Sequence, residues 1–169
     1  MILRKDFQAK FVDNLIANLK EKDLIIRRKS ILALGMLGGK TLKSIVQLYM
    51  DTNNKTVKVS CLKTMIKVVV NCNLEELTQE EMLVVESALK DDSPEIILSV
   101  ISLLRQLGKT GRNILIKICR DKDLLRAKAA ISALLEMKDE TIDDLFDDLL
   151  NDKSIDQMIK EDILRDKSI

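Results

Sequence analysis

The chain has 169 residues, of which 46% are hydrophobic, 33% charged and 2% aromatic, and it contains five glycines and one proline. A chain this apolar buries a core and is not disordered, and so few glycines and prolines exclude an all-β sandwich or barrel, which needs a turn about every 8–12 residues. Histidine and tryptophan are absent, which excludes histidine-based acid–base catalysis, histidine metal ligands and Ser-His or Cys-His nucleophile pairs.

The net charge of +1 conceals two oppositely charged halves. Residues 1–70 contain 14 Lys and Arg against 5 Asp and Glu, a net charge of +9, whereas residues 71–169 contain 14 against 22, a net charge of −8. Each end of the molecule therefore carries its own field, which directs charged partners to different ends and permits weak head-to-tail self-association.

Apolar residues at helical spacing predict pairs of short helices from the start of the chain. In the first pair, the stripe from Phe7 to Leu19 is followed by the polar sequence KEKD, and Ile31, Leu34 and Leu37 then form the inward face of a second helix. The first helix of the next pair carries the same stripe at Leu42, Ile45, Val46 and Tyr49.

Local signals mark where these helices end and begin. Gly38 and Gly108 follow the second helix of a pair, where a left-handed residue ends a helix. Ser93 and Pro94 predict a helix start in which the serine hydroxyl is the cap and proline takes the first helical position. The spacing of a capping box occurs twice, in Thr78 with Glu81 and in Ser154 with Gln157.

The chain also repeats itself. Residues 23–38, DLIIRRKSILALGMLG, recur at 123–138 as DLLRAKAAISALLEMK, and the segments 54–69 and 93–108 align between them, with successive offsets of 31, 39 and 30 residues. A period of about 30 residues with two short helices is typical of a helical-hairpin repeat. We therefore predict an all-α protein: one domain, residues 1–169, that forms a right-handed α-solenoid (superhelix) of about five helical hairpins. We expect the repeats at about 6–39, 40–70, 78–109 and 111–138, an insertion at 71–77, and a degenerate C-terminal cap at 141–166.

Two segments resemble HEAT repeats: Ile26-Arg27-Arg28 followed by Ala33-Leu34-Gly35, and Asp92-Ser93-Pro94-Glu95-Ile96 followed by Leu103-Leu104. Over roughly residues 14–138, the short unit is similar to the HEAT-like repeats of phycobilisome-lyase-type proteins. The resemblance implies the armadillo-like helical superfamily. It also implies a ladder in which an acidic residue of one turn pairs with a basic residue of a neighbouring repeat. Ile97 and Ala127 occupy the basic position in the third and fourth units, so we expect the ladder to be interrupted there.

The second helices of such an array line a concave surface, where we expect a partner to bind. With Ile31 and Leu34 inward, the opposite face of that helix is basic and apolar, and the aligned faces become small and polar and then acidic along the chain. Exposed lysines one turn apart suit an acidic partner, although a solvated helix face and scattered exposed Leu and Met are the plain alternatives. The candidate binding residues are Lys29, Leu32, Met36, Lys63, Lys67, Ser102, Gln106, Ser132 and Glu136.

The N-terminal sequence MILRKDF lacks the apolar stretch of a signal peptide, and no apolar run approaches the ~18 residues of a membrane span. We therefore expect a cytoplasmic protein without a membrane partner. Cys61, Cys72 and Cys119 lack CxxC spacing, which predicts free thiols and no metal site. Their positions in the repeat predict that Cys61 and Cys119 are core residues and that Cys72 is exposed.

No residue set supports catalysis, and we expect neither an enzyme nor a cofactor. The leading hypothesis is a protein–protein interaction scaffold or adaptor that holds a partner with an acidic segment on its concave surface. An alternative, implied only by the resemblance, is a bilin lyase-like or phycobilisome-associated subunit that handles a chromophore. A second alternative is nucleic-acid backbone binding by the basic half, which the absence of Trp and the single Tyr disfavour, because few aromatic rings are available for base stacking.

Overall fold

A computed structural model of the protein describes residues 2–137 and 142–166. These residues form ten α-helices and one short 3-10 helix with no strand among them, so the predicted all-α class is confirmed. The helices are α1 (Ile2–Asn18), α2 (Leu24–Leu37), η1 (Gly39–Thr41), α3 (Leu42–Asp51), α4 (Lys55–Cys72), α5 (Gln79–Leu89), α6 (Pro94–Gln106), α7 (Gly108–Ile118), α8 (Leu124–Met137), α9 (Ile142–Asn151) and α10 (Gln157–Asp166).

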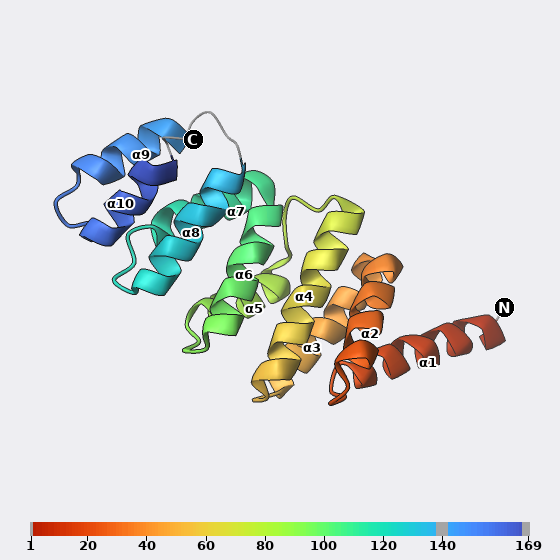
Figure 1. Cartoon of the computed structure of the whole chain (residues 1–169). Helices are drawn as coiled ribbons and strands as arrows, with labels where there is room; N and C mark the ends of the chain where they lie inside the picture. Colours follow the sequence, from red (N-terminus) through yellow and green to blue (C-terminus); the bar gives the residue numbers. More distant parts are fainter. Residues whose placement is uncertain (1, 138–141, 167–169) are drawn as a thin grey trace.

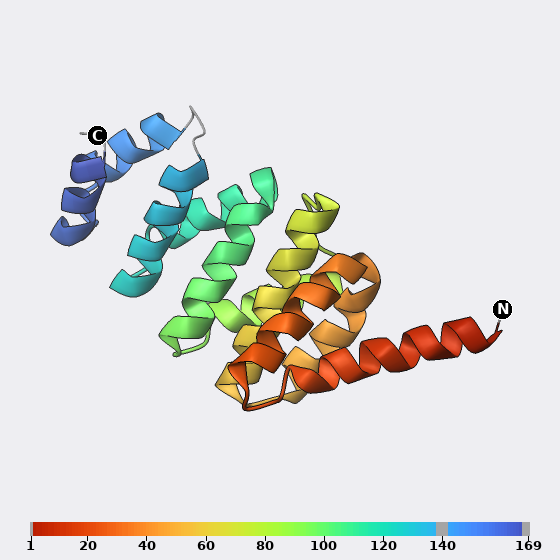
Figure 2. The ribbon, with the colours of Figure 1, turned by 45° about the vertical axis from the view of Figure 1, so that its right-hand side comes forward.

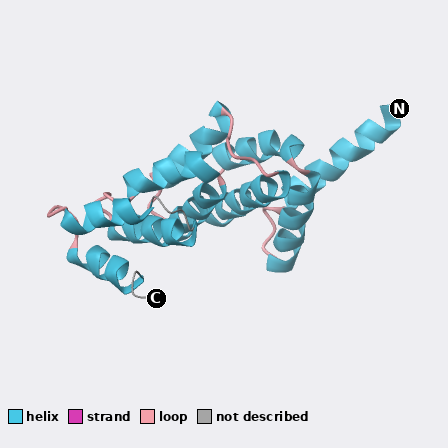
Figure 3. Ribbon diagram, turned by 90° about the horizontal axis from the view of Figure 1, so that it is seen from above, coloured by secondary structure: helices cyan, strands magenta, loops and turns pink. Residues whose placement is uncertain are grey.

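Consecutive helices pack in pairs, and the pairs stand side by side along the molecule (Figure 1). The second helices of the pairs contact one another in order, α2 with α4, α4 with α6, α6 with α8 and α8 with α10. The first helices make a second layer, in which α3 contacts both α1 and α5 (Figure 3). Residues 138 and 141, which bound two of the predicted repeats, lie outside the described residues.

The core lies between the two layers and uses the predicted apolar stripes. Ile31 and Leu34 of α2 are 8% and 0% exposed, and Tyr49 of α3 is 1% exposed. Close helix contacts depend on two glycines. A Cβ on Gly35 would lie 2.5 Å from the Cβ of Lys67 on α4, and a Cβ on Gly111 would overlap the carbonyl oxygen of Leu104.

Several helix ends match the predicted signals. The Thr78 hydroxyl accepts from the Glu81 amide at 3.3 Å, and the Glu81 carboxylate accepts from the Thr78 amide at 2.8 Å, which confirms that capping box. Gly38 and Gly108 both have positive φ, 77° and 51°. Pro94 does take the first position of α6, as predicted.

Two of the predicted caps are wrong. The Ser93 hydroxyl makes no cap, and the Ser93 amide instead donates to the Asp91 carboxylate at 2.9 Å. Ser154 lies before the start of α10 and donates to the Asp152 carboxylate at 2.7 Å, while the Asp156 carboxylate accepts from the Met158 amide at 2.8 Å. At α10 an aspartate takes the cap that was expected of a serine, because a carboxylate is a stronger hydrogen-bond acceptor than a hydroxyl.

A polar ladder joins the turns of neighbouring pairs. Lys58 Nζ on α4 lies 3.5 Å from a carboxylate oxygen of Asp91, which is in the turn before α6. The guanidinium of Arg126 on α8 donates to the Asp91 carbonyl at 3.1 Å. Arg126, one position before Ala127, therefore supplies a basic group, but it reaches back to the turn before α6, whereas Lys58 reaches forward to that turn.

Among the described residues, no single helix combines the length and apolarity needed to cross a membrane. In the part of the chain that the structure describes, one pair of helical segments, Leu24–Leu37 with Gly39–Asp51, reaches that length and apolarity together, but the two segments are bent by 118°.

Candidate functional site: a groove along the second helices

The largest of three adjoining hollows lies across α2, α4 and α6 and has a volume of about 610 Å³. A second hollow of about 310 Å³ lies between α2 and α4, and a third of about 230 Å³ lies between α6 and α8. Arg28, Ile31, Lys63 and Ile66 line both of the first two, whereas Leu98 and Ser102 line both the first and the third. These shared residues make the three hollows one continuous depression, which we call the groove.

The lining side chains of each second helix point into the groove together because residues four apart in a helix lie on the same side of it. On α2, Arg28 precedes Leu32 by one turn, and on α4, Lys63 precedes Lys67 by one turn. All four line the smaller hollow between these helices.

The walls of the groove differ in charge. Arg28 and Lys63 are exposed on the side formed by α2 and α4, and Glu95 is exposed on α6. Arg27 also lines the groove, but its guanidinium already donates to the carbonyl oxygens of Glu21 and Lys22 at 2.6 and 2.7 Å. Arg27 therefore fixes the turn before α2, whereas Arg28 and Lys63 have basic groups available to a ligand.

At the other end of the groove, Arg105 on α6 forms an ion pair with Glu136 on α8. The two side chains are 31% and 60% exposed, so the pair is largely in contact with solvent and contributes little to stability. The ion pair neutralises Glu136, the acidic candidate binding residue at this end of the groove.

The groove also has apolar lining. Leu98 is 46% exposed and Leu32 is 52% exposed, while Ile31 and Ile66 are more covered. The groove thus combines apolar surface with three exposed basic groups on one side, those of Arg28, Lys63 and Lys67, and a carboxylate on the other. This combination suits an elongated, largely apolar ligand with acidic groups at its edge.

The predicted binding residues do not all lie in the groove. Leu32, Lys63, Lys67, Ser102, Ser132 and Glu136 line it. Lys29, Met36 and Gln106 are absent from the linings of the three hollows. Ser60 and Ser99, which align with Lys29, are only 4% and 8% exposed, because the preceding second helix covers their side of α4 and α6.

Sequence reasoning missed several lining residues, among them Arg28, Glu95, Leu98 and Arg105. They lie on the side of each helix adjacent to the predicted face. The signal that could have found Arg28 and Leu98 is a basic or apolar residue one turn before a predicted one, here Leu32 and Ser102.

The three cysteines lie as predicted, with Cys72 exposed and Cys61 and Cys119 buried, and all are free thiols. Burial raises the pKa of both Cys61 and Cys119 to about 12, so these two remain protonated thiols at neutral pH. Within the ranges that the structure describes, no three cysteine or carboxylate side chains gather as a metal site.

The chain is similar in sequence to a bilin biosynthesis protein and to a phycocyanin operon protein. It is 29% identical over 153 residues to the bilin biosynthesis protein CpeZ of Synechococcus sp. (strain WH8020), covering 87% of this chain and 82% of that protein. It is 26% identical over 112 residues to the uncharacterized phycocyanin operon protein Z of Pseudanabaena tenuis (strain PCC 7409), covering 66% of this chain but only 55% of that protein. No family model matches the sequence. The two relatives support the predicted link to phycobilisome-lyase-type proteins.

Proposed function

We propose that this protein handles bilins and that it holds the bilin, free or attached to its carrier protein, in the groove across α2, α4 and α6. The observation that carries the proposal is the similarity to a bilin biosynthesis protein over 87% of this chain. The similarity favours the chromophore-handling alternative over a scaffold without a ligand. We also propose that the helix pairs are HEAT-like hairpins of a right-handed α-solenoid in a cytoplasmic protein, which the pairwise packing supports.

The chemistry of a bilin fits the groove. A bilin is an open-chain tetrapyrrole with a flat, largely apolar conjugated system, pyrrole N–H groups and two propionate carboxylates. The hollow of about 610 Å³ falls within the ~300–1,000 Å³ of ordinary ligand sites. Its apolar residues provide contact area for the rings, and its charged residues are placed at the edges.

Each charged group has a role in this proposal. Arg28 and Lys63 bind the propionate carboxylates, since both are exposed and both line the two hollows nearest α2. Glu95 accepts hydrogen bonds from pyrrole N–H groups on the opposite side, and Leu98 packs against a ring. No residue here is assigned a catalytic step, and the groove binds and orients the chromophore.

The test is a titration of biliverdin, a soluble bilin, followed by visible absorbance and by circular dichroism induced in the chromophore. The double variant Arg28→Glu with Lys63→Glu replaces two attractions by two repulsions. Exposed ion pairs are worth ~0.2–1 kcal/mol each, and reversal adds a similar repulsion, so we expect an affinity loss of about tenfold or more. Binding by the unaltered protein should weaken as salt is added.

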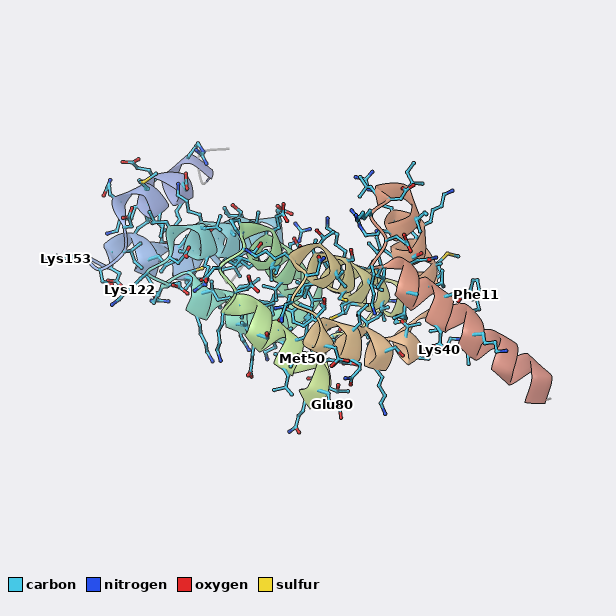
Figure 4. All side chains as sticks on the ribbon, turned by 90° about the horizontal axis from the view of Figure 1, so that it is seen from below. Phe11, Lys40, Met50, Glu80, Lys122 and Lys153 are labelled. Atoms are coloured by element: carbon cyan, nitrogen blue, oxygen red, sulfur yellow. The ribbon has the colours of Figure 1, made fainter. Side chains whose placement is uncertain are left out.

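A matched control uses the same charge change outside the groove. Lys122 and Lys153 are exposed and line none of the three hollows, and Figure 4 shows both lysines far from α2. The double variant Lys122→Glu with Lys153→Glu should bind biliverdin like the unaltered protein. Equal loss in both double variants, or no loss in the groove variant, contradicts the proposed site.

The scaffold hypothesis stays as a second candidate, because the groove extends past the largest hollow to α8 and Lys67 lies beside its apolar part. A partner with an acidic helix would then bind with no bilin present. Binding of a bilin-free carrier protein with the same sensitivity to Arg28→Glu and Lys63→Glu, together with no response to biliverdin, would favour the scaffold.

A further inference from the structure

One repeat position of the second helices points toward the preceding helix of the row. Glu136 on α8 pairs with Arg105 on α6, and a Cβ on Gly35 of α2 would lie 2.5 Å from that of Lys67 on α4. Glu136 and Lys67 both align with Met36 of α2. The side of α2 that carries Met36 is therefore the side that a preceding second helix would cover.

A second position on this side is covered in the internal helices. Ser60 on α4 and Ser99 on α6 are only 4% and 8% exposed, and Ala129 on α8 lines the hollow between α6 and α8. All three align with Lys29 of α2. Three later second helices thus have a small residue at this position, whereas α2 has a long basic one.

On α2 the same side is open. This helix is the first of the row in the described part of the chain, and Figure 2 shows α1 running outward from this end. Met36 is 82% exposed, Ile25 is 62% exposed, and Lys29 between them is also exposed. Spacings of four and seven residues put these three on one side of the helix over about three turns, and we call them the open flank. Leu32 lies at its border, because it lines the hollow shared with α4.

The charge around the open flank is one-sided. The acidic residues of the preceding turn, Glu21 and Asp23, are matched by Lys20 and Lys22, and Asp23 caps α2. Every charged residue of α2 and α4 is basic: Arg27, Arg28, Lys29, Lys55, Lys58, Lys63 and Lys67. A ligand on the open flank therefore meets apolar side chains and positive charge.

The position and charge of the open flank indicate what fits it. End repeats usually turn a polar surface to water, and exposed apolar residues such as Met36 and Ile25 mark an interaction site. Because the side faces a helix in the internal pairs, another helix fits its shape. A second copy of this chain that paired the same flank would bring basic residues against basic residues, which disfavours symmetric self-association.

We propose that the open flank of α2 binds an acidic amphipathic helix of another protein, which lies beside α2 where a preceding second helix would lie. Ile25 and Met36 pack against its apolar residues, and Lys29 pairs with a carboxylate between them. The proposal does not rest on the bilin proposal, since these three residues line none of the hollows of the groove. It also differs from the scaffold hypothesis, which places the partner in the groove on Arg28 and Lys63.

The test uses a fluorescently labelled synthetic peptide of about four helical turns, with leucines along one side and glutamates beside them. Fluorescence anisotropy measures its binding to the full chain at low and at high ionic strength. We expect the peptide to bind and its affinity to fall when salt is added. The same peptide with lysine at every glutamate should not bind.

Variants of the protein locate the peptide. Met36→Glu should weaken binding at least about tenfold, because it removes an apolar contact and repels the peptide. Met36→Leu should retain binding. Met50→Glu on α3 is the matched control, since Met50 is 53% exposed and lies in the other layer, and it should bind the peptide like the unaltered protein. Met36→Glu should also bind biliverdin like the unaltered protein, which separates this site from the groove.

Three results would overturn the proposal: no binding of the acidic peptide at low salt, equal binding of the lysine peptide, or equal affinity in Met36→Glu and the unaltered protein. Vesicles of phosphatidylcholine with phosphatidylglycerol test the other surface that suits basic and apolar residues. Binding of the protein to these vesicles, with none to the acidic peptide, would assign the open flank to a membrane and overturn the proposal.

Discussion

The contact between α6 and α7 gives a sharp test of the packing. Gly111 is in α7, and its missing Cβ makes room for the preceding helix. A Cβ there would overlap the Leu104 carbonyl oxygen and lie 2.7 Å from the Leu104 carbonyl carbon and 3.2 Å from its Cα. These atoms belong to the backbone of a buried helix end, so no side-chain rotation relieves the overlap.

The variant Gly111→Ala should therefore destabilise the protein, although alanine is normally the better helix former by ~1 kcal/mol. Overpacking of this kind costs ~1–3 kcal/mol and sometimes more. For a protein of this size, each kcal/mol lowers Tm by ~2–4 °C, so we expect a decrease of ~2–12 °C. Urea unfolding and thermal unfolding, both followed by far-UV circular dichroism, measure the change.

Gly39→Ala is the matched control. A Cβ on Gly39 would meet nothing within 4 Å, and Gly39 is not among the glycines with positive φ. The same substitution there should leave the free energy of unfolding unchanged or raise it by up to ~1 kcal/mol. If Gly111→Ala unfolds at the same urea concentration as the unaltered protein, the close approach of α6 and α7 is refuted.

Two further predictions concern titratable groups. Cys72 should react quickly with a thiol reagent in the native protein, whereas Cys61 and Cys119 should react only on unfolding. The reason is that both are buried, which raises the pKa of each to about 12. Mass spectrometry measures the labelling, and fast labelling of Cys61 in the native protein contradicts its burial. The hydrogen bond from Lys128 holds the pKa of Asp162 below its usual value, so its stabilising contribution is present above the unfolded pKa and is lost as pH falls through the folded pKa. Asp162→Asn should therefore unfold with a weaker dependence on pH below about 4 in acid titrations, and an unchanged dependence counts against the pairing.

Much of the fold follows from periodicity in the sequence. The stripes that contain Ile31, Leu34 and Tyr49 predict helices whose apolar sides are buried, and all three side chains are buried. Local capping was predicted where one strong signal stood alone, as at Thr78. It failed at Ser93, whose hydroxyl makes no cap and whose own amide donates to the Asp91 carboxylate.

The groove was less accessible to sequence reasoning. Helical spacing tells which side of α2 is buried, but it does not tell which exposed side meets a neighbouring helix. That depends on how the helices cross, which is a property of the packed array. Lys29 and Met36 were therefore assigned to a continuous binding face, whereas they lie at the open end of the row, and Arg28 was missed. Arg126 was likewise missed as a ladder residue, because one position of register separates it from Ala127.

Hydrogen–deuterium exchange with and without biliverdin is the most direct test of the proposed bilin site. The account predicts slower exchange on binding in the peptides of α2, α4 and α6 that contain Arg28, Lys63 and Glu95, which line the groove. It predicts no change in α9 or α10. Protection confined to α9 and α10, or none anywhere at saturating biliverdin, would contradict the groove as the bilin site.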